Sequence, residues 1–377
     1  MGVGKRGAAS VGLVGAILLF PVAAHAKTTT VFMGVPTQKV QKQLGAIAAK
    51  ADPRAFMDIN DFFPHGVTIH VGDRIKFVDN NTFHSVDLPR KGKRPLSLIS
   101  PTGTLVSGVN DEAGNPFWFN GKLPNVAFTP ALLKSGFGKH FTYRGTKRIL
   151  SGLPLGPAKP FMVKFAKAGT YTYYCNVHAG MTGVVRVVRK GRKIARAKAA
   201  PRLLKAQVKR DLKQARGLVA KTSVPANTLD VGASAGRSHV EYYGMLPGNL
   251  TVKAGTSLTF RMGPKVTDVH TASFGTDDPG AQPPNPAGYL TTLAKTFEGA
   301  GPFDPRAVWG SDPPTVTATA TLSPTTHGNG FWNTGVMDTV KGGPLPPSGE
   351  VTFSTPGTYQ YYCLIHTNMH GTITVTP

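Results

Sequence analysis

The amino-acid sequence predicts an all-β protein built from two tandem β-sandwich domains joined by a basic helical linker. The chain repeats the pattern F-x3-G-T-Y-x-Y-Y-C at residues 165–175 and 353–363. Short alternating runs rich in Val, Thr, Tyr and Phe fill both copies and stand between clusters of Gly, Pro, Asn and Asp. With 377 residues, 40% of them hydrophobic, the chain is long enough for two domains with cores of their own.

Residues 1–26 have the layout of a secretory signal. Lys5 and Arg6 precede an apolar run from Val11 to Phe20, and the small-residue exit Ala24-His25-Ala26 follows. A membrane anchor is the alternative, but this run is shorter than the roughly 18 residues expected of a spanning helix. We therefore expect cleavage after Ala26 and a mature protein that is soluble and either periplasmic or extracellular.

Residues 27–188 are expected to form the first domain. Val67-Thr68-Ile69 and Gly183–Val187 alternate as strands do, and an antiparallel β-sandwich is the natural architecture for such runs. Residues 37–50 have helical composition and no counterpart in the second copy, which predicts an insertion. Residues 90–115 are dense in Pro, Gly and polar residues and are expected to form a long loop.

Residues 189–224 form the predicted linker. Thirteen Lys or Arg and one acid, Asp211, lie between Arg189 and Lys221. Apolar residues follow helical spacing after Pro201, which predicts a helix that packs on a domain through one stripe. This stripe consists of Leu204, Val208, Leu212, Ala215 and Val219.

Residues 225–377 are expected to form the second domain, because they repeat the first. FPHGVTIHVGD at 63–73 aligns with LPGNLTVKAGT at 246–256, an offset of 183 residues, and the two cysteines are offset by 188. So small a drift indicates two copies of one fold with a few loop insertions, among them the Pro-rich and Gly-rich loop 277–314.

Each copy carries a potential metal site directly after its repeated strand. The motif C-x2-H-x2-M occurs as Cys175, His178 and Met181, and again as Cys363, His366 and Met369. A loop this short brings a thiolate, an imidazole and a thioether towards one point, which is the ligand set of a blue copper site that lacks only its second histidine.

The missing histidine has a candidate at the same place in each copy. His84 lies 91 residues before Cys175, and His270 lies 93 residues before Cys363. The soft thiolate suits Cu(I), imidazole suits both oxidation states and a weak axial methionine tunes the potential. A histidine on a sheet strand and three ligands on one loop would make a rigid site, which favours electron transfer over substrate binding.

These residues resemble the cupredoxin family, which includes plastocyanin, azurin and amicyanin. The resemblance covers residues 58–188 and 241–376, and the C-x2-H-x2-M loop is most similar to that of amicyanin. It implies cupredoxin-type Greek-key β-sandwiches with two type 1 sites that cycle between Cu(I) and Cu(II). The implied ligands are His84, Cys175, His178, Met181, His270, Cys363, His366 and Met369. Many family members have Asn directly after the upstream histidine, whereas this chain has Ser85 and Thr271.

Several alternatives compete with two copper sites in an electron carrier. A Cys175–Cys363 disulfide would require both loops to face each other across the domains. Core packing of a lone Cys, Met or His is the ordinary interpretation, but the same four residue types recur in register. Packing is the expected role of Tyr173, Tyr174, Tyr361 and Tyr362, with a redox relay as their alternative.

An oxidase is a further alternative that the histidine count limits. No two of the eleven histidines are spaced i, i+2, so a trinuclear centre of the laccase type has no ligands. An interdomain copper of the nitrite-reductase type would have to be assembled from histidines that do not cluster in the sequence. Copper storage or delivery is a third possibility, and the sequence alone distinguishes it poorly from electron transfer. The histidines outside the two sites and the signal are His65, His70, His140, His239, His327 and His370, of which His370 has no assigned role.

The formal charge of +24 at pH 7 is concentrated, because the segment from Arg189 to Lys221 alone supplies +12. An acidic redox partner, an anionic membrane or a cell-wall polymer would fit this segment, and a solvated helix face is the alternative. Nucleic acid is a poor partner for an exported protein without a recognised binding module. The sequence therefore predicts an exported copper protein that is an electron carrier and not an enzyme.

Overall fold

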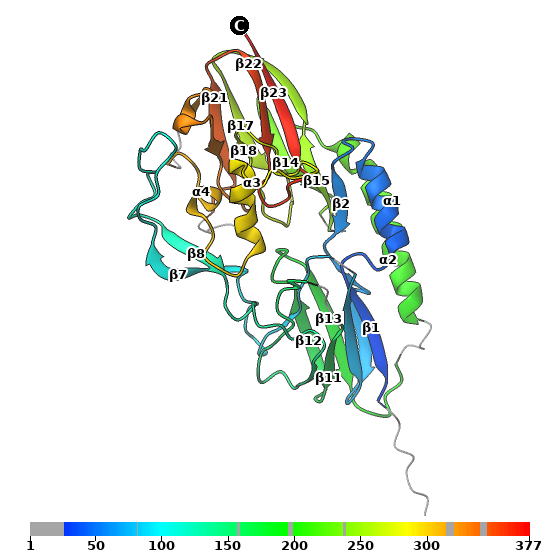
Figure 1. Cartoon of the computed structure of the whole chain (residues 1–377). Coiled ribbons are helices and arrows are strands. Elements are labelled where there is room, and N and C mark those ends of the chain that lie inside the picture. Colours follow the sequence, from blue (N-terminus) through cyan, green and yellow to red (C-terminus); the bar gives the residue numbers. More distant parts are fainter. Residues whose placement is uncertain are drawn as a thin grey trace, which may run out of the picture.

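The computed structural model describes residues 26–80, 82–156, 159–194, 199–236, 239–313, 320–339 and 345–377. Residues 1–25 of the predicted signal lie outside the described residues. In the described part of the chain, no helix is long and apolar enough to cross a membrane. Two β-rich halves lie end to end, with the N-terminal half at the bottom of Figure 1 and the C-terminal half at the top.

The first half contains two five-stranded sheets, with strand orders β3-β1-β5-β11-β9 and β10-β6-β12-β13-β4. The first sheet consists of β1 (Thr28–Met33), β3 (Phe62–Phe63), β5 (Arg74–Asp79), β9 (His140–Tyr143) and β11 (Phe161–Phe165). The second consists of β4 (Gly66–His70), β6 (Asp87–Leu88), β10 (Ile149–Leu150), β12 (Gly169–Tyr174) and β13 (Thr182–Val188).

The second half repeats this arrangement with one strand added, in the orders β19-β21-β17-β14-β15-β2 and β16-β23-β22-β18-β20. The first sheet consists of β2 (Phe56–Ile59), β14 (Thr228–Ser234), β15 (Val240–Leu246), β17 (Thr256–Met262), β19 (Ala320–Leu322) and β21 (Ser348–Phe353). The second consists of β16 (Asn249–Lys253), β18 (Ser273–Phe274), β20 (Trp332–Asn333), β22 (Gly357–Tyr362) and β23 (His370–Thr376). The predicted duplication of one all-β fold is thus confirmed.

The sheets are mixed, so the expectation of purely antiparallel sandwiches is wrong in part. β1 runs parallel to β5 and β14 runs parallel to β17. β13 and β4 are also parallel, as are β23 and β16. Alternating hydrophobicity specifies which residues form strands and which face is buried, but it carries no information about the direction of the neighbouring strand.

Alternation along the strands builds a core in each half. In β11, Phe161, Val163 and Phe165 are fully buried, as are Ile75 and Phe77 in the neighbouring strand β5. The second half has an equivalent cluster between its own sheets. A core of this kind is what makes each sandwich rigid enough to position side chains at one end.

The repeated tyrosines confirm the packing interpretation at two positions. Tyr173 and Tyr361 are both fully buried. Tyr173 packs edge-on against Phe77, and Tyr361 packs edge-on against Phe260, with ring centroids 5.1 Å apart in each pair.

Two helices pack together beside the second half. α1 (Gln38–Ala48) begins where the Thr37 side chain accepts a hydrogen bond from the backbone N–H of Val40, and it confirms the predicted helix at 37–50. α2 (Ala199–Lys221) is the predicted linker helix. Its apolar stripe is buried against α1, β2 and β15, so the helix does pack on the folded body, as the stripe indicated.

Strand β2 joins the two halves. It lies within residues 27–188 of the chain, yet it pairs antiparallel with β15 at the edge of the second half's sheet. Met57 and Ile59 of this strand are fully buried in the cluster that also contains the apolar faces of α1 and α2. A segment that lies between the first two strands of the first sandwich thus completes the second.

The two long loops carry short elements of their own and pack against each other. The first contains β7 (Ile99–Leu105), which pairs with β8 (Pro124–Phe128). Figure 1 shows these two strands beside the helices of the second loop. Both loops contribute to one apolar cluster, which includes Val106 of the first loop and Leu290 and Phe303 of the second, so this core spans the two halves. The short helices are α3 (Tyr289–Ala294), η1 (Lys295–Glu298), α4 (Pro305–Val308) and η2 (Thr326–Gly328).

Candidate metal centres

The first group of predicted ligands meets at the end of the first sandwich. Cys175 directly follows β12, and its Sγ lies 3.6 Å from Nδ1 of His178 and 4.0 Å from Nδ1 of His84. The two Nδ1 atoms are 2.9 Å apart. All three side chains are buried.

The second group repeats this geometry. Cys363 follows β22, and its Sγ lies 3.9 Å from Nδ1 of His270 and 4.0 Å from Nδ1 of His366. Here the Nδ1 atoms are 3.1 Å apart. His270 is fully buried, and 18% of the His366 side chain is exposed.

The same backbone hydrogen bonds close both ligand loops and bring the methionines to the sites. Cys175 N–H donates to the carbonyl of Met181 over 3.0 Å, and Cys363 N–H donates to that of Met369 over 3.1 Å. Both methionines are buried, each in the core cluster that contains its cysteine. Each methionine thus belongs to the same loop and the same core as its cysteine, and its role as the thioether ligand stays a prediction.

Backbone donors surround each sulfur. The N–H groups of Ser85 and Val177 lie 3.5 and 3.4 Å from Sγ of Cys175. Those of Thr271 and His366 both lie 3.4 Å from Sγ of Cys363. A sulfur that accepts hydrogen bonds is stabilised as a thiolate, the form that binds metals.

The hydroxyl groups that replace asparagine after the upstream histidines hold the ligand loops in place. Ser85 Oγ accepts a hydrogen bond of 2.8 Å from the N–H of Asn176. Thr271 Oγ1 accepts one of the same length from the N–H of Leu364. In each half this N–H belongs to the residue after the cysteine, so the hydroxyl ties the segment of the upstream histidine to the cysteine's loop. The expectation of a histidine on a sheet strand is wrong, because His84 lies between β5 and β6 and His270 between β17 and β18.

The pKa shifts agree with a thiolate in each site. Burial raises the pKa of the Cys175 thiol, but the contacts with His178 and His84 outweigh it and hold this pKa well below its usual range. The pKa of Cys363 is also well below its usual range, because His270 and His366 outweigh its burial. A bound metal cation would stabilise the thiolate in the same way as the neighbouring imidazoles do here.

Each donor set fits one copper ion. One Sγ and two Nδ1 atoms lie within 4.8 Å of one another in each half, a spread that one ion with bonds of about 2.0–2.3 Å can span. A thiolate, two imidazoles and a weak thioether are the donors of blue copper sites. Held in this way, copper would supply a one-electron couple, while the chain would supply buried, preset ligands.

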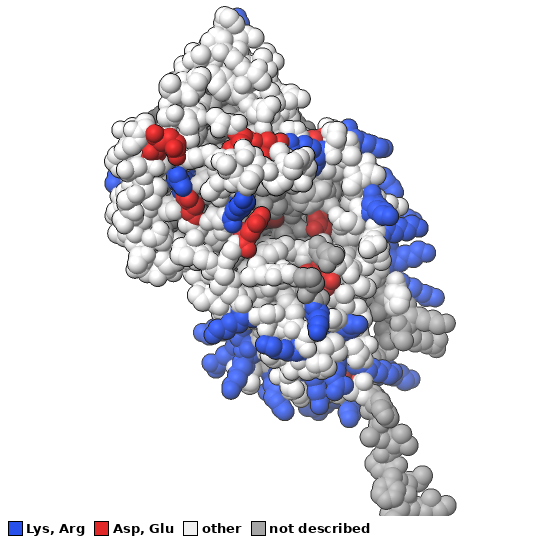
Figure 2. Space-filling view, in the orientation of Figure 1, with Lys and Arg blue, Asp and Glu red and all other residues white. Residues whose placement is uncertain are grey.

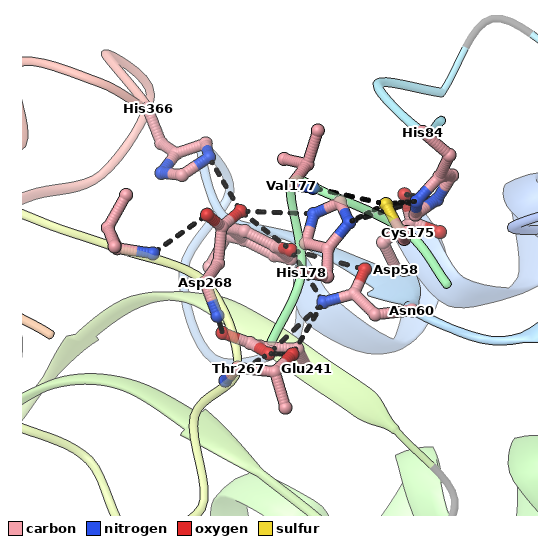
Figure 3. Close-up of polar contacts among 12 residues, drawn as sticks. Asp58, Asn60, His84, Cys175, Val177, His178, Glu241, Thr267, Asp268 and His366 are labelled. Atoms are coloured by element: carbon pink, nitrogen blue, oxygen red, sulfur yellow. Dashed lines mark hydrogen bonds and ion pairs between the residues drawn. The ribbon is translucent and has the colours of Figure 1, made fainter. Parts of the chain in front are cut away.

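Carboxylates face the other ring nitrogen of every ligand histidine. Nε2 of His84 lies 4.0 Å from Oδ2 of Asp58, and Nε2 of His270 lies 3.7 Å from Oε1 of Glu241. Asp268 faces both remaining imidazoles, as Figure 3 shows. Metal-binding histidines commonly direct the second nitrogen at a carboxylate, which favours the tautomer whose Nδ1 is free to bind.

Two glycines at equivalent places make room for the upstream histidines. Gly34 follows β1 with a φ of +75°, and a Cβ there would lie 2.3 Å from Nε2 of His84. Gly232, in β14, has a φ of +76°, and its Cβ would lie 3.0 Å from Nε2 of His270. Only glycine fits both the backbone conformation and the space at Gly34.

The sequence analysis did not single out these carboxylates and glycines. The signal for the glycines was present, because each follows the apolar residues of the first strand of its copy. Asp268 carried no such signal, since Thr82 stands at the corresponding position of the first copy.

The histidines outside the two sites do not assemble a third one. In the described ranges, His, Cys, Asp and Glu side chains that could hold one ion are grouped only around Cys175 and Cys363. Four of the other histidines face single acids, at 3.0 Å for His65 and Asp61, 3.8 Å for His70 and Asp73, 3.1 Å for His327 and Asp111, and 3.6 Å for His370 and Asp52. The two cysteines are free and each belongs to its own site, so the alternative of a disulfide between them is not realised.

Comparisons with known proteins agree with this geometry. The sequence profile of a family described as "Copper binding proteins, plastocyanin/azurin family" matches residues 55–188. No curated protein matches the chain.

Among solved structures, the chain is similar to oxidised plastocyanin from Dryopteris crassirhizoma, with 23% identity, 40% of this chain and 99% of that chain covered, and a TM-score of 0.19. Auracyanin from Roseiflexus castenholzii is 19% identical, with 36% and 88% covered and a TM-score of 0.20. Auracyanin A from Chloroflexus aurantiacus is 17% identical, with 40% and 96% covered and a TM-score of 0.21. At these identities the similarity concerns the fold alone.

Proposed function

Because the chain belongs, through residues 55–188, to the plastocyanin/azurin family of copper-binding proteins, we propose that it is an exported blue copper protein that carries electrons. Each half would hold one type 1 copper between its cysteine, its two histidines and its methionine. The observation that carries the proposal is the twofold occurrence of a buried Cys-His-His group whose sulfur accepts backbone hydrogen bonds.

Electron transfer is favoured over copper storage or delivery because contacts within the protein hold the ligands in place. The cysteine loops are closed by backbone hydrogen bonds, and the upstream histidines are fully buried. A site that changes little between oxidation states has a low reorganisation cost, whereas a delivery site must open to release its metal. Two sites of the same donor type also favour a carrier over an enzyme with a separate catalytic copper.

Loading with Cu(II), followed by visible and EPR spectroscopy and a metal count, tests the two sites. We expect two coppers per chain and intense thiolate-to-copper absorption. Cys175→Ser and Cys363→Ser should each remove one copper and its absorption, because each leaves the other thiolate intact. A protein that remains colourless would overturn the proposal.

The carrier is distinguished from a delivery protein by what leaves the site. An electron carrier should undergo repeated reduction and reoxidation with both coppers retained. Slow redox cycling with ready transfer of the metal to a chelator would instead support delivery. The copper count before and after cycling decides between them.

Export is proposed from the signal pattern of residues 1–26, and one contact near its end supports it. The backbone nitrogen of Lys27 donates to Oδ1 of Asp73 over 2.9 Å, directly before β1 begins at Thr28. After cleavage at Ala26 this nitrogen would be a charged amino group beside a buried carboxylate, a stronger contact than the amide makes. N-terminal sequencing of exported protein should begin at Lys27; an uncleaved N terminus would contradict the proposal.

The uneven charge supports an acidic redox partner for the first half and the linker. Residues 27–188 contain 21 Lys and Arg against 8 Asp and Glu, whereas residues 225–377 contain 7 against 10. Figure 2 shows Lys and Arg side chains gathered over the first half and beside α1 and α2. We expect association with an acidic redox protein that weakens as salt is added. Binding to anionic vesicles alone would favour a membrane surface instead.

A further inference from the structure

One carboxylate lies between the two candidate copper sites. Oδ2 of Asp268 is 3.3 Å from Nε2 of His178 in the first half and 3.2 Å from Nε2 of His366 in the second. Figure 3 shows the Asp268 side chain between the two imidazoles, with the carboxylate directed at both. Only 6% of this side chain is exposed, so water does not compete freely for the contacts.

The orientation of the two imidazoles suits a bridge. His178 and His366 direct Nδ1 at their own cysteine sulfur and Nε2 at Asp268. When Nδ1 binds a metal, the ring proton is on Nε2, and this N–H can donate to the carboxylate. A single oxygen can accept both hydrogen bonds, because a carboxylate oxygen has two lone pairs.

Other contacts hold the bridge in position. The N–H of Val269 donates to Oδ1 of Asp268 over 2.7 Å, and the Tyr243 hydroxyl donates to Oδ2 over 3.3 Å. On the other side, the N–H of Ala179, next to His178, donates to the carbonyl of Thr267 over 2.9 Å. The ligand loop of the first half is thus tied directly to the segment that carries Asp268.

We propose that Asp268 is a positioning residue that couples the two copper sites, so that an electron crosses between the halves through His178, Asp268 and His366. The proposal rests on the function proposed above. The exchange is a one-electron step: one site is oxidised from Cu(I) to Cu(II), the other is reduced from Cu(II) to Cu(I), and no bond or proton need be lost. Electron tunnelling decays less steeply through hydrogen bonds than through empty space, so this contact offers a short connection between the sites.

The burial of the two histidines supports an internal route. His178 is 5% exposed and 18% of the His366 side chain is exposed, and their Nε2 edges both point at Asp268. Neither edge is presented to solvent as a free docking point. The chain would then act as a two-site relay instead of two independent carriers.

The hydrogen bonds can be tested without electron transfer. In imidazole ¹H–¹⁵N spectra of the diamagnetic Cu(I) protein and of the copper-free protein, we expect two slowly exchanging Nε2–H signals, from His178 and His366. Asp268→Asn should shift or weaken them, because the uncharged amide has one acceptor oxygen where the carboxylate has two, and Oδ1 already accepts from the N–H of Val269. Asp211→Asn is the control, since it neutralises a buried carboxylate in α2, outside the bridge and outside both groups of ligands.

The electron step is measured by reducing a small fraction of the oxidised protein with a flash and following its redistribution. A Met369→Gln background gives the second site a different spectrum and potential, because the axial ligand tunes both. We expect a first-order phase that is independent of protein concentration. Asp268→Asn should slow it by about tenfold or more, as loss of a group behind a ligand commonly does, and Asp211→Asn should leave it within about twofold.

Asp268→Glu provides a second variant if the asparagine variant does not fold. It keeps the charge but moves the oxygen by one methylene, so it should also slow the exchange. Unchanged redistribution in a variant that retains two coppers and has shifted or weakened Nε2–H signals would overturn the coupling while leaving the blue copper function intact. Failure to bind copper would instead overturn the function, and the two failures are therefore distinguishable.

Discussion

At the residue scale, each ligand imidazole contacts a thiolate with Nδ1 and faces a carboxylate with Nε2. Both nitrogens of an isolated neutral imidazole can carry the proton, and the wrong tautomer cannot bind a metal through Nδ1. Asp268 lies within hydrogen-bond distance of Nε2 of His178 and His366, so it attracts the proton to Nε2 and leaves Nδ1 free. Asp58 and Glu241 lie 4.0 and 3.7 Å from Nε2 of His84 and His270, which is too far for a hydrogen bond, and favour the same tautomer only through their charge.

The glycine behind His84 gives a prediction at this scale. Gly34→Ala should displace His84, because the new Cβ would lie 2.3 Å from its Nε2 and 2.7 Å from Oγ1 of Thr82. We expect loss of copper from the first site, or a changed absorption spectrum, with the second site retained. A metal count and a visible spectrum of the variant measure this.

Gly72→Ala is the matched control. Gly72 also has a positive φ, of +95°, but a Cβ there would meet nothing within 4 Å. Both substitutions carry the backbone strain of about 1–2 kcal/mol for a side chain in this region, so only the contact with His84 separates them. If both variants lost copper equally, backbone strain and not the contact would be responsible.

The two groups of one cysteine and two histidines could be predicted from the sequence because their signals are repeated in both copies. Cys175 and His178 are three residues apart, and the upstream histidine recurs at nearly the same distance in both copies. The roles of Asp58 and Asp268 could not be predicted, because both acids face histidines across the boundary between the halves. Asp58, in a strand of the second half's sheet, faces His84 of the first half, and Asp268 faces one histidine of each half. That proximity arises only when the halves pack together.

At the element scale, β2 shows how one short strand determines the packing of the halves. Asp58 of β2 is paired in the sheet register with Glu241 of β15. The Asp58 carboxylate lies 4.0 Å from His84, and the Glu241 carboxylate lies 3.7 Å from His270. The run 56–59 alternates as a strand should, but its sequence does not specify which sheet it joins. Helix α2, by contrast, was predictable because its stripe is amphipathic over the whole length.

Asp211 makes the contribution of α2 dependent on pH. Burial raises its pKa to about 6, against the lowering effect of Arg210 and with a further rise from Asp61. The folded protein thus binds this proton more tightly than the unfolded chain, whose pKa is about 3.9. The contribution of Asp211 to the free energy of unfolding should fall as pH rises from about 4 to about 6 and stay low above that.

Asp211→Asn should therefore stabilise the protein at pH 7, by about 1 kcal/mol, and should not do so at pH 4. Urea unfolding of both proteins across this pH range measures the difference. Glu298→Gln, at an exposed acid of η1, serves as the control and should not change the pH profile. A stabilisation that is equal at pH 4 and pH 7 would contradict a buried carboxylate as the cause.

At the scale of the whole molecule, the halves share too much core to behave as separate domains. One apolar cluster contains residues of both long loops, and another contains α1, α2, β2 and β15. The sequence predicts domains at 27–188 and 225–377 because the repeat gives each copy its own strands and ligands. It could not predict the shared clusters, since the loops and the helical insertion have no repeat to align.

Shared cores predict cooperative unfolding of the two halves. Phe161 in the first half and Phe353 in the second are both fully buried, and truncation of either to alanine should cost about 3–5 kcal/mol. We expect a single calorimetric transition in the copper-free wild type that moves to lower temperature in Phe161→Ala and in Phe353→Ala alike. If each substitution moved only one of two resolved transitions, the halves would unfold independently, and the contacts through β2 and the long loops would be too weak to couple them. With copper bound, the same coupling should make both thiolate absorptions disappear together on heating, because the site of the intact half is lost when its neighbour unfolds.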